Sequence, residues 1–235
     1  MEKNYVTQKI LGLSYLEILF LKQMEELEKL SFSQKILDTL IAKKDVVLKA
    51  VSNKPLQEGV VPFLPAIPVK MMDSTGQLKY HNGWRFADSM EIYAQFNGFL
   101  YNEERMWNLV NAAEPYFLVN VSVCPLEEVP APAQGKSQND IGYVAREFFK
   151  NKGLHTLNHV EALSVACHSK LMPADKNLCA FSCDWDGFEF AAVYHSFDAR
   201  GNGLCNTSFS IQNGFLKKRA RNHKDILVPV CEKRV

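Results

Sequence analysis

Apolar and polar residues near the start of the chain alternate with the spacing of an α-helix. Ser14 and Glu17 have the spacing of a capping box, in which each side chain accepts a bond from the other residue's backbone N–H. Apolar residues then recur at helical intervals, at Leu16, Leu19, Phe20, Met24, Leu27 and Leu30. A second pattern begins at Ser31 or Ser33, and residues 45–51 extend it or form a third helix. We predict packed helices here, because the pattern is too short for a coiled coil.

The next segments are rich in prolines and aromatic residues. Val60 to Val69 contains Pro62, Pro65 and Pro68, and residues without an N–H exclude a central strand. We expect an extended segment that lies over the core. Residues 77–111 hold a dense set of aromatic side chains, which favours core packing, a ligand pocket or a partner surface. Helices are expected around residues 89–95 and 103–111 of this part.

Regular elements are clearer from Tyr116 onward. Tyr116 to Val123 is rich in β-branched and aromatic residues and predicts a strand. Asp140 to Asn151 predicts a helix, which Gly153 ends in the usual C-terminal position.

Leu157 to Gln212 carries the strongest pattern in the chain. Asn158 suits a helix N-cap, and Glu161 stands three residues later, as a capping box requires. Asn158→Ala should cost about 1 kcal/mol, and Glu161→Ala less, because we expect the glutamate's bond to be the more exposed one. Three runs with strand character follow, at residues 177–184, 188–197 and 204–212. They predict an antiparallel meander with the helix packed on one face.

Together these elements predict an α+β fold, with N-terminal helices followed by a mixed domain of an antiparallel sheet and packed helices. We divide the chain into a helical segment at residues 1–53, an α+β domain at residues 60–212 and a basic C-terminal segment at residues 213–235. Ile226 to Cys231 is expected to add an edge strand.

One segment resembles a known family. Val61-Pro62-Phe63-Leu64-Pro65-Ala66-Ile67-Pro68 is similar to the P-F-x-x-x-I-P segment of an uncharacterised bacterial family, a domain of unknown function. The Pro115-Tyr116 strand, the capped helix at Leu157 and the last strand with serine and cysteine occur there in a similar order. The resemblance runs from the N-terminal helices to about Gln212, although residues 77–108 depart from it. It implies no activity, cofactor or catalytic residue.

Composition narrows the class of protein. The chain has 235 residues and a net charge of +1, so it shows no overall bias toward an anionic partner. No apolar run approaches the ~20 residues that span a bilayer. Six cysteines are too few for a disulfide scaffold, and Glu17 interrupts the first apolar cluster, which lacks the features of a secretory signal. We therefore predict a soluble, cytoplasmic protein with reduced thiols; export by a route without a recognisable signal is the alternative.

One pair of residues could support nucleophilic catalysis. Neighbouring antiparallel strands could place Cys205 beside His195, and Asp198 or Asp184 could orient the imidazole. Against this, alternation places Cys205 on the same strand face as several apolar residues, which favours a core cysteine.

Other residues with ligand chemistry have unsuitable spacing. His155 precedes the predicted N-cap, so it would not share a helix face with His159. Cys179 and Cys183 would lie about 13 Å apart on one strand, which is too far for one metal ion or one disulfide. We therefore predict no metal site, and no glycine-rich loop predicts a nucleotide cofactor.

Basic residues gather near the end of the chain. Residues 215–235 contain seven basic and two acidic residues, and the cluster consists of Lys217, Lys218, Arg219 and Arg221. Such a cluster can bind phosphates of nucleic acid or of a membrane surface, whereas a solvated surface stretch is the simpler interpretation.

The sequence leaves open whether the protein is an enzyme. Our leading hypothesis is a non-catalytic binding or interaction domain for a small apolar ligand or a protein partner. The alternatives are a cysteine-dependent hydrolase or transferase that uses Cys205 and His195, and a module that binds polyanions through its basic C-terminal segment.

Overall fold

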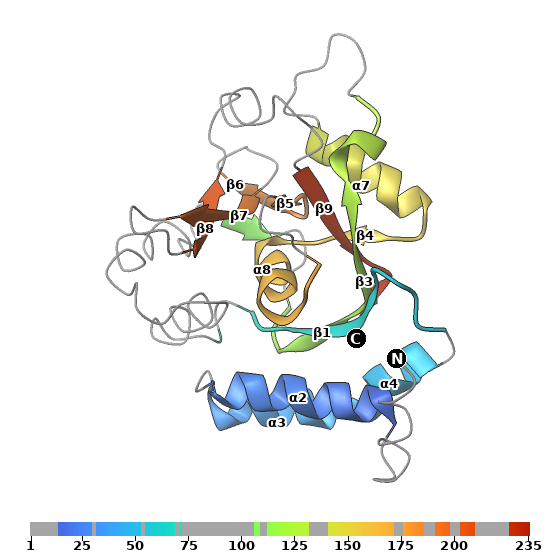
Figure 1. Ribbon diagram of the computed structural model, residues 1–235, viewed down its shortest axis with the longest axis vertical. Helices are drawn as coiled ribbons and strands as arrows, with labels where there is room; N and C mark the ends of the chain where they lie inside the picture. The colour runs from blue at the N-terminus through green and yellow to red at the C-terminus, as the bar shows by residue number, and fades with distance from the viewer. Residues whose placement is uncertain are drawn as a thin grey trace.

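The computed structural model describes residues 14–29, 32–52, 55–68, 71, 106–108, 112–131, 141–171, 176–185, 191–197, 203–209 and 226–235. In this part of the chain, helices cover both faces of a curved, mixed sheet (Figure 1). The predicted α+β class is confirmed.

Three helices form a layer at one end of the molecule. They are α2 (Tyr15–Lys29), α3 (Gln34–Ala42) and α4 (Lys44–Ser52). The predicted capping box at α2 is confirmed: the Ser14 amide donates to Glu17 Oε2 at 2.8 Å, and the Glu17 amide donates to Ser14 Oγ at 3.3 Å. Ser33 takes the N-cap position of α3 but makes no side-chain capping bond.

Eight of the described strands form one sheet. Its main path runs through β1 (Val61–Ala66), β3 (Tyr116–Pro125), β9 (Ile226–Cys231), β5 (Asn177–Ala180), β7 (Ala191–Phe197) and β8 (Gly203–Phe209). Two short strands complete it: β10 (Lys233–Arg234) pairs with β3, and β4 (His155–Thr156) pairs with β9. Neighbours are antiparallel except β5 and β9, which are parallel. The proline-rich β1 ends this path, in agreement with its exclusion from a central position.

The expectation of an edge strand at residues 226–231 is wrong. β9 lies between β3 and β5, and all six of its residues are buried. The physical reason is its unbroken apolar run, which is typical of a strand covered on both faces. The carbonyl of Pro229 in β9 accepts a bond from the Leu157 amide at 3.1 Å. The residue directly after β4 therefore also bonds to the backbone of β9.

Helices α8 (His159–His168) and α7 (Ile141–Asn151) lie on different sides of β9 (Figure 1). Leu227 and Cys231 of β9 join the core that includes α8, whereas Ile226, Val228 and Val230 join the core of α7. The 3-10 turn η2 (Leu126–Glu128) adds Leu126 to the second core. Gly153 adopts a φ of 74° after α7, which confirms the predicted end of that helix.

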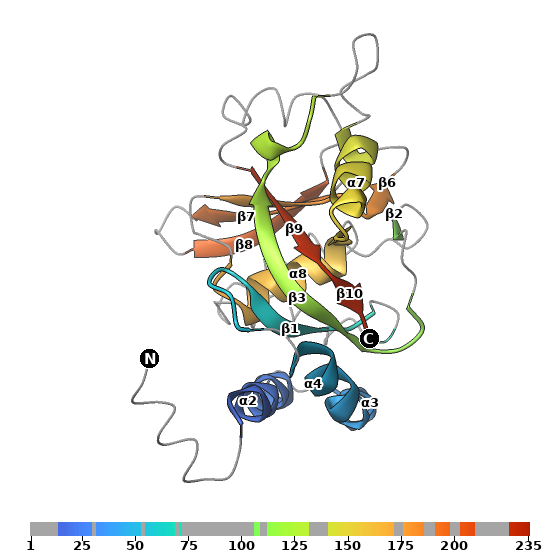
Figure 2. The ribbon, with the colours of Figure 1, turned by 90° about the vertical axis from the view of Figure 1, so that its right-hand side faces the viewer.

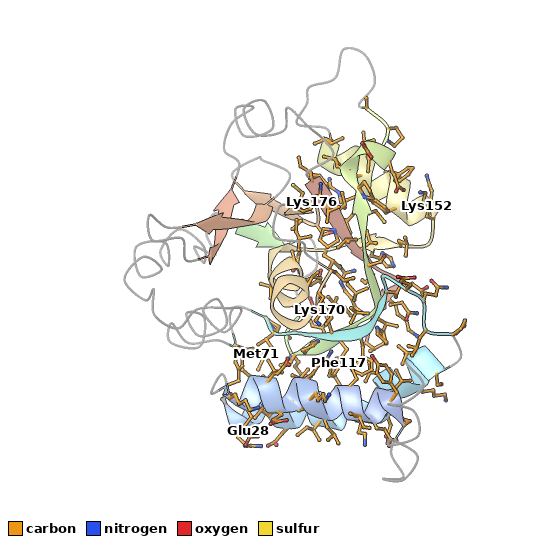
Figure 3. All side chains as sticks on the ribbon, viewed as in Figure 1. Glu28, Met71, Phe117, Lys152, Lys170 and Lys176 are labelled. Atoms are coloured by element: carbon orange, nitrogen blue, oxygen red, sulfur yellow. The ribbon has the colours of Figure 1, made fainter. Side chains whose placement is uncertain are left out.

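Aromatic packing joins the helical layer to the sheet. The ring of Phe20 in α2 lies 5.5 Å from Phe117 in β3 and 6.2 Å from Phe63 in β1, measured between centroids. Phe117, labelled in Figure 3, lies where the sheet meets these helices. Gln23 of α2 also donates from Nε2 to the Phe63 carbonyl at 2.9 Å. The N-terminal helices therefore share one hydrophobic core with β1, β3 and α8.

Two further local expectations are wrong. Residues 177–184 form parts of two strands, because β5 ends at Ala180 and β6 (Cys183–Trp185) pairs instead with β2 (Met106–Asn108) in a separate sheet. Cys179 and Cys183 consequently do not share a strand. Residues 106–108 were expected to be helical; they form β2, because pairing with β6 overrides local helical preference. The expected helix at residues 89–95 lies outside the described residues.

Candidate functional site

The structure pairs the two residues that were proposed as nucleophile and base. His195 on β7 and Cys205 on β8 are direct partners in the antiparallel register. Asp184 lies on β6, where it pairs with Trp107. Asp198 lies outside the described residues, as do Lys217, Lys218, Arg219 and Arg221.

The two histidines considered as metal ligands belong to different elements. His155 lies in β4 opposite Cys231, whereas His159 is the first residue of α8. In the described ranges, no group of three or more histidine, cysteine, aspartate or glutamate residues could hold a metal ion.

A buried polar network surrounds the start of α8. The predicted capping box is confirmed: Asn158 Oδ1 accepts from the Glu161 amide at 2.9 Å, and Glu161 Oε2 accepts from the Asn158 amide at 2.8 Å. Glu161 is nevertheless fully buried, so the expectation that its bond is exposed is wrong. Tyr116 of β3 donates its hydroxyl to Glu161 Oε1 at 2.6 Å.

Arg234 of β10 completes this network. Its Nε lies 2.6 Å from Glu161 Oε1 and its Nη2 lies 2.8 Å from Glu161 Oε2, so the guanidinium and the carboxylate are paired twice. The same Nη2 donates to the Thr156 carbonyl at 3.0 Å. That carbonyl also accepts from Ser182 Oγ at 2.8 Å, and the network thereby reaches the segment after β5.

The electrostatics of this network oppose acid–base chemistry. Burial, followed by the charge and the hydrogen bond of Glu161, raises the pKa of Tyr116 well above its ordinary value. Burial by itself lowers the pKa of Arg234, but the hydrogen bond and charge of Glu161 outweigh it and raise that pKa. Burial also raises the pKa of the neighbouring Cys231 thiol to about 12, so it stays protonated at neutral pH. We therefore interpret the network as a structural connection between α8, β3 and β10.

Sequence reasoning missed Arg234 and Tyr116 as partners of Glu161. The capping-box spacing identified the glutamate because that motif spans three residues. Arg234 lies 73 residues away and Tyr116 lies 45 residues away, so no local pattern connects them with the helix.

A depression of about 190 Å³ lies beside α4 and β3. Aliphatic and polar groups contribute about equally to its walls, and the polar members come from β3, from the bend after β9 and from the segment before β1. The lining residues are Val51, Pro55, Leu56, Gln57, Val60, Pro62, Asn120, Ser122, Leu154 and Glu232.

Asn120 marks a change in the pairing of β3 at this depression. It is a non-glycine residue with a positive φ, 50°, a conformation that asparagine tolerates better than most side chains. Residues 118–119 pair with β10, whereas residues 122–125 pair with β9 (Figure 2). Asn120 Nδ2 donates to Glu232 Oε2 at 2.9 Å, and the Glu232 amide donates to the Val119 carbonyl at 2.9 Å. These bonds fix a half-buried carboxylate beside the depression.

The depression combines features that favour binding. Apolar walls gain free energy when a ligand removes them from water, and a few fixed polar groups give orientation. Unusual backbone conformations are also frequent at ligand sites, so the φ of Asn120 draws attention to this position. Among the described residues that line the depression, none is a cysteine or a histidine, so the arrangement favours recognition over nucleophilic catalysis.

Comparison of the chain with protein-family models, with curated proteins and with solved structures finds no match. The resemblance to the uncharacterised bacterial family therefore stays a prediction. None of the described helices combines the length and the apolar character needed to cross a membrane.

Proposed function

We propose that the protein is a non-catalytic interaction module that accepts one side chain of a partner protein in the depression beside Asn120. The observation that carries this proposal is the combination of aliphatic walls with the fixed pair Asn120 and Glu232. Such a surface can bury an apolar stem and bond its polar end.

The size of the depression favours a side chain over a whole small molecule. Pockets for drug-sized ligands usually measure about 300–1,000 Å³. The volume here is about 190 Å³, which suits a single side chain better. The remaining contacts with a partner would then come from the rim, where Leu56 is 57% exposed.

The residues that line the depression are held by a paired strand and a packed helix, so a partner could bind with little change in the structure. Asn120 and Ser122 belong to β3, which is paired on both of its sides. Val51 belongs to α4, and only 4% of its surface is exposed. A preorganised wall and floor lose little conformational entropy when a partner binds.

The test is selection of peptides from a displayed random library, followed by measurement of their affinity for wild type and two variants. Ser122→Tyr places a large side chain in the depression. Ser33→Tyr makes the same change at the exposed N-cap position before α3, where the side chain has no capping bond to lose. Peptides should bind wild type and Ser33→Tyr equally and should lose binding to Ser122→Tyr. If every selected peptide binds Ser122→Tyr as well as wild type, the proposal is wrong.

A cysteine-dependent hydrolase or transferase is the second candidate. The observation that favours it is the direct pairing of His195 and Cys205 between β7 and β8. A base beside a thiol can lower its pKa and make it nucleophilic. Its test is the selective labelling of Cys205 described in the Discussion.

A further inference from the structure

We infer that the partner side chain accepted by the depression is a glutamine, bound through its neutral carboxamide. This inference rests on the proposed function and adds the chemistry of the partner residue. Three neutral polar side chains that line the depression carry it: Gln57, Asn120 and Ser122.

These three side chains hold hydrogen-bonding atoms that the described part of the chain does not use. Asn120 donates from Nδ2 to Glu232 Oε2 at 2.9 Å, and this bond identifies the other terminal atom of its amide, Oδ1, as an acceptor. Within the described residues, Asn120 Oδ1, the Ser122 hydroxyl and the Gln57 carboxamide have no hydrogen-bond partner. Asn120 and Ser122 are half-buried and Gln57 is exposed, so a partner has access to all three.

The unused hydrogen-bonding atoms are of both kinds. Asn120 Oδ1 needs a donor, the Gln57 carboxamide offers both a donor and an acceptor, and the Ser122 hydroxyl can act as either. A carboxamide presents an N–H donor and a carbonyl acceptor side by side. One such group can therefore donate to Asn120 and accept from Gln57 or Ser122.

The stem of a glutamine suits the apolar part of the same surface. Leu56, Val60, Pro62 and Leu154 contribute aliphatic groups to the walls. Glutamine has two methylene groups before its amide, whereas asparagine has one, so glutamine removes more apolar surface from water on reaching the same polar atoms. The depression thus favours the longer of the two carboxamide side chains.

Other side chains match the unused atoms less well. An ionised acidic side chain only accepts, so it would leave Asn120 Oδ1 without a donor. A lysine or arginine only donates, so it would leave the Gln57 N–H groups without an acceptor. An apolar side chain would take all of these atoms from water and bond none of them, which carries a desolvation cost. Selectivity for a carboxamide comes partly from these unfavourable alternatives.

The experiment uses pools of blocked, ten-residue random peptides that differ only in one fixed central residue. The fixed residue is glutamine, methionine, glutamate or lysine, and fluorescence polarisation measures the affinity of each pool. Methionine is the apolar counterpart, because its side chain is also unbranched. The glutamine pool should bind wild type about tenfold more tightly than the methionine pool, through the added hydrogen bonds. It should also bind more tightly than the two charged pools.

The double variant Gln57→Met, Ser122→Ala removes two of the three neutral groups. It should reduce the preference for glutamine to about twofold or less, because only Asn120 Oδ1 remains. The matched control is Ser33→Ala, Gln34→Met, which makes the same two changes at exposed positions that do not line the depression. That control should keep the tenfold preference, and urea unfolding should find both double variants folded.

A second measurement needs no variant. In NMR spectra of wild type, the glutamine pool should shift the side-chain amide resonances of Gln57, and the methionine pool should shift them less. Equal shifts with the two pools would contradict a bond between the partner's carboxamide and Gln57.

Three results of the binding experiment would overturn the inference. They are equal affinity of the glutamine and methionine pools, tighter binding of a charged pool, and a tenfold preference that survives in Gln57→Met, Ser122→Ala. If all pools bind equally and Ser122→Tyr abolishes that binding, the interaction module stands and only the glutamine is wrong. If no pool binds wild type, both the inference and the proposed function fail.

Discussion

Glu161 and Arg234 form a doubly hydrogen-bonded ion pair that joins the first turn of α8 to β10. The two bonds measure 2.6 Å and 2.8 Å, the Glu161 side chain is fully buried, and the Arg234 side chain is 17% exposed. A buried charge whose partner is removed is strongly destabilising, because water cannot replace the partner. The pair therefore matters to stability more through the cost of breaking it than through its net gain.

Glu161→Gln should lower the free energy of unfolding by about 3–5 kcal/mol, because it leaves the Arg234 guanidinium without a counter-charge. Equilibrium urea unfolding measures this change. Asn158→Ala should cost less, because the neutral capping bond it removes contributes about 1 kcal/mol and the change leaves no buried charge without its partner. This order reverses the one expected from the sequence. Equal stability of wild type and Glu161→Gln would contradict the interpretation of the network as a structural connection.

The sequence could predict those parts of this region that depend on short spacings. Asn158 and Glu161 define the capping box over three residues, and the alternation in residues 204–209 agrees with β8. The pairing of β9 between β3 and β5 depends on partners distant in the chain, and so does the contact of Arg234 with Glu161. The depression could not be predicted for the same reason, since residues from α4, β3 and the bend after β9 meet only in the folded chain.

Substitutions at Asn120 should separate the backbone requirement from the side-chain bond. Asn120→Gly removes the bond to Glu232 but accepts a positive φ without steric cost. Asn120→Ala removes the same bond and also places a Cβ in the left-handed region, which adds about 1–2 kcal/mol. Thermal or urea unfolding should therefore find the alanine variant less stable than the glycine variant. Within a strand, alanine is usually more stable than glycine, so this order would be the opposite of the usual one. An alanine variant of equal or greater stability would show that the left-handed backbone at residue 120 is not required.

The buried thiol of Cys231 should make the protein less stable in alkali. Its pKa is raised to about 12 from an ordinary value of 9.0, so the folded state retains a proton that the unfolded chain loses first. The contribution of this protonated thiol to the free energy of unfolding is fully present below pH 9 and is lost as the pH rises toward 12. Its slope is at most about 1.4 kcal/mol per pH unit.

Urea unfolding of wild type and Cys231→Ala between neutral and alkaline pH checks this prediction. The variant should show a shallower loss of stability above pH 9. Cys124→Ala is the comparison, because Cys124 is only half-buried and its replacement leaves the Cys231 contribution in place. Parallel curves for wild type and Cys231→Ala would contradict the raised pKa of this thiol.

Labelling of Cys205 decides between the interaction module and the cysteine-dependent enzyme. If His195 activates this thiol across the β7–β8 pair, iodoacetamide should modify Cys205 in the folded protein faster than it modifies the other cysteines. His195→Asn should then slow the reaction, because it removes the base and keeps a polar side chain. The interaction module predicts no selective labelling of Cys205 and no effect of His195→Asn.

Mass spectrometry of digested, briefly labelled protein measures each site, and Cys231 supplies an internal reference for a slow thiol because its side chain is fully buried. Rapid labelling that depends on His195 would place the enzyme ahead of the interaction module.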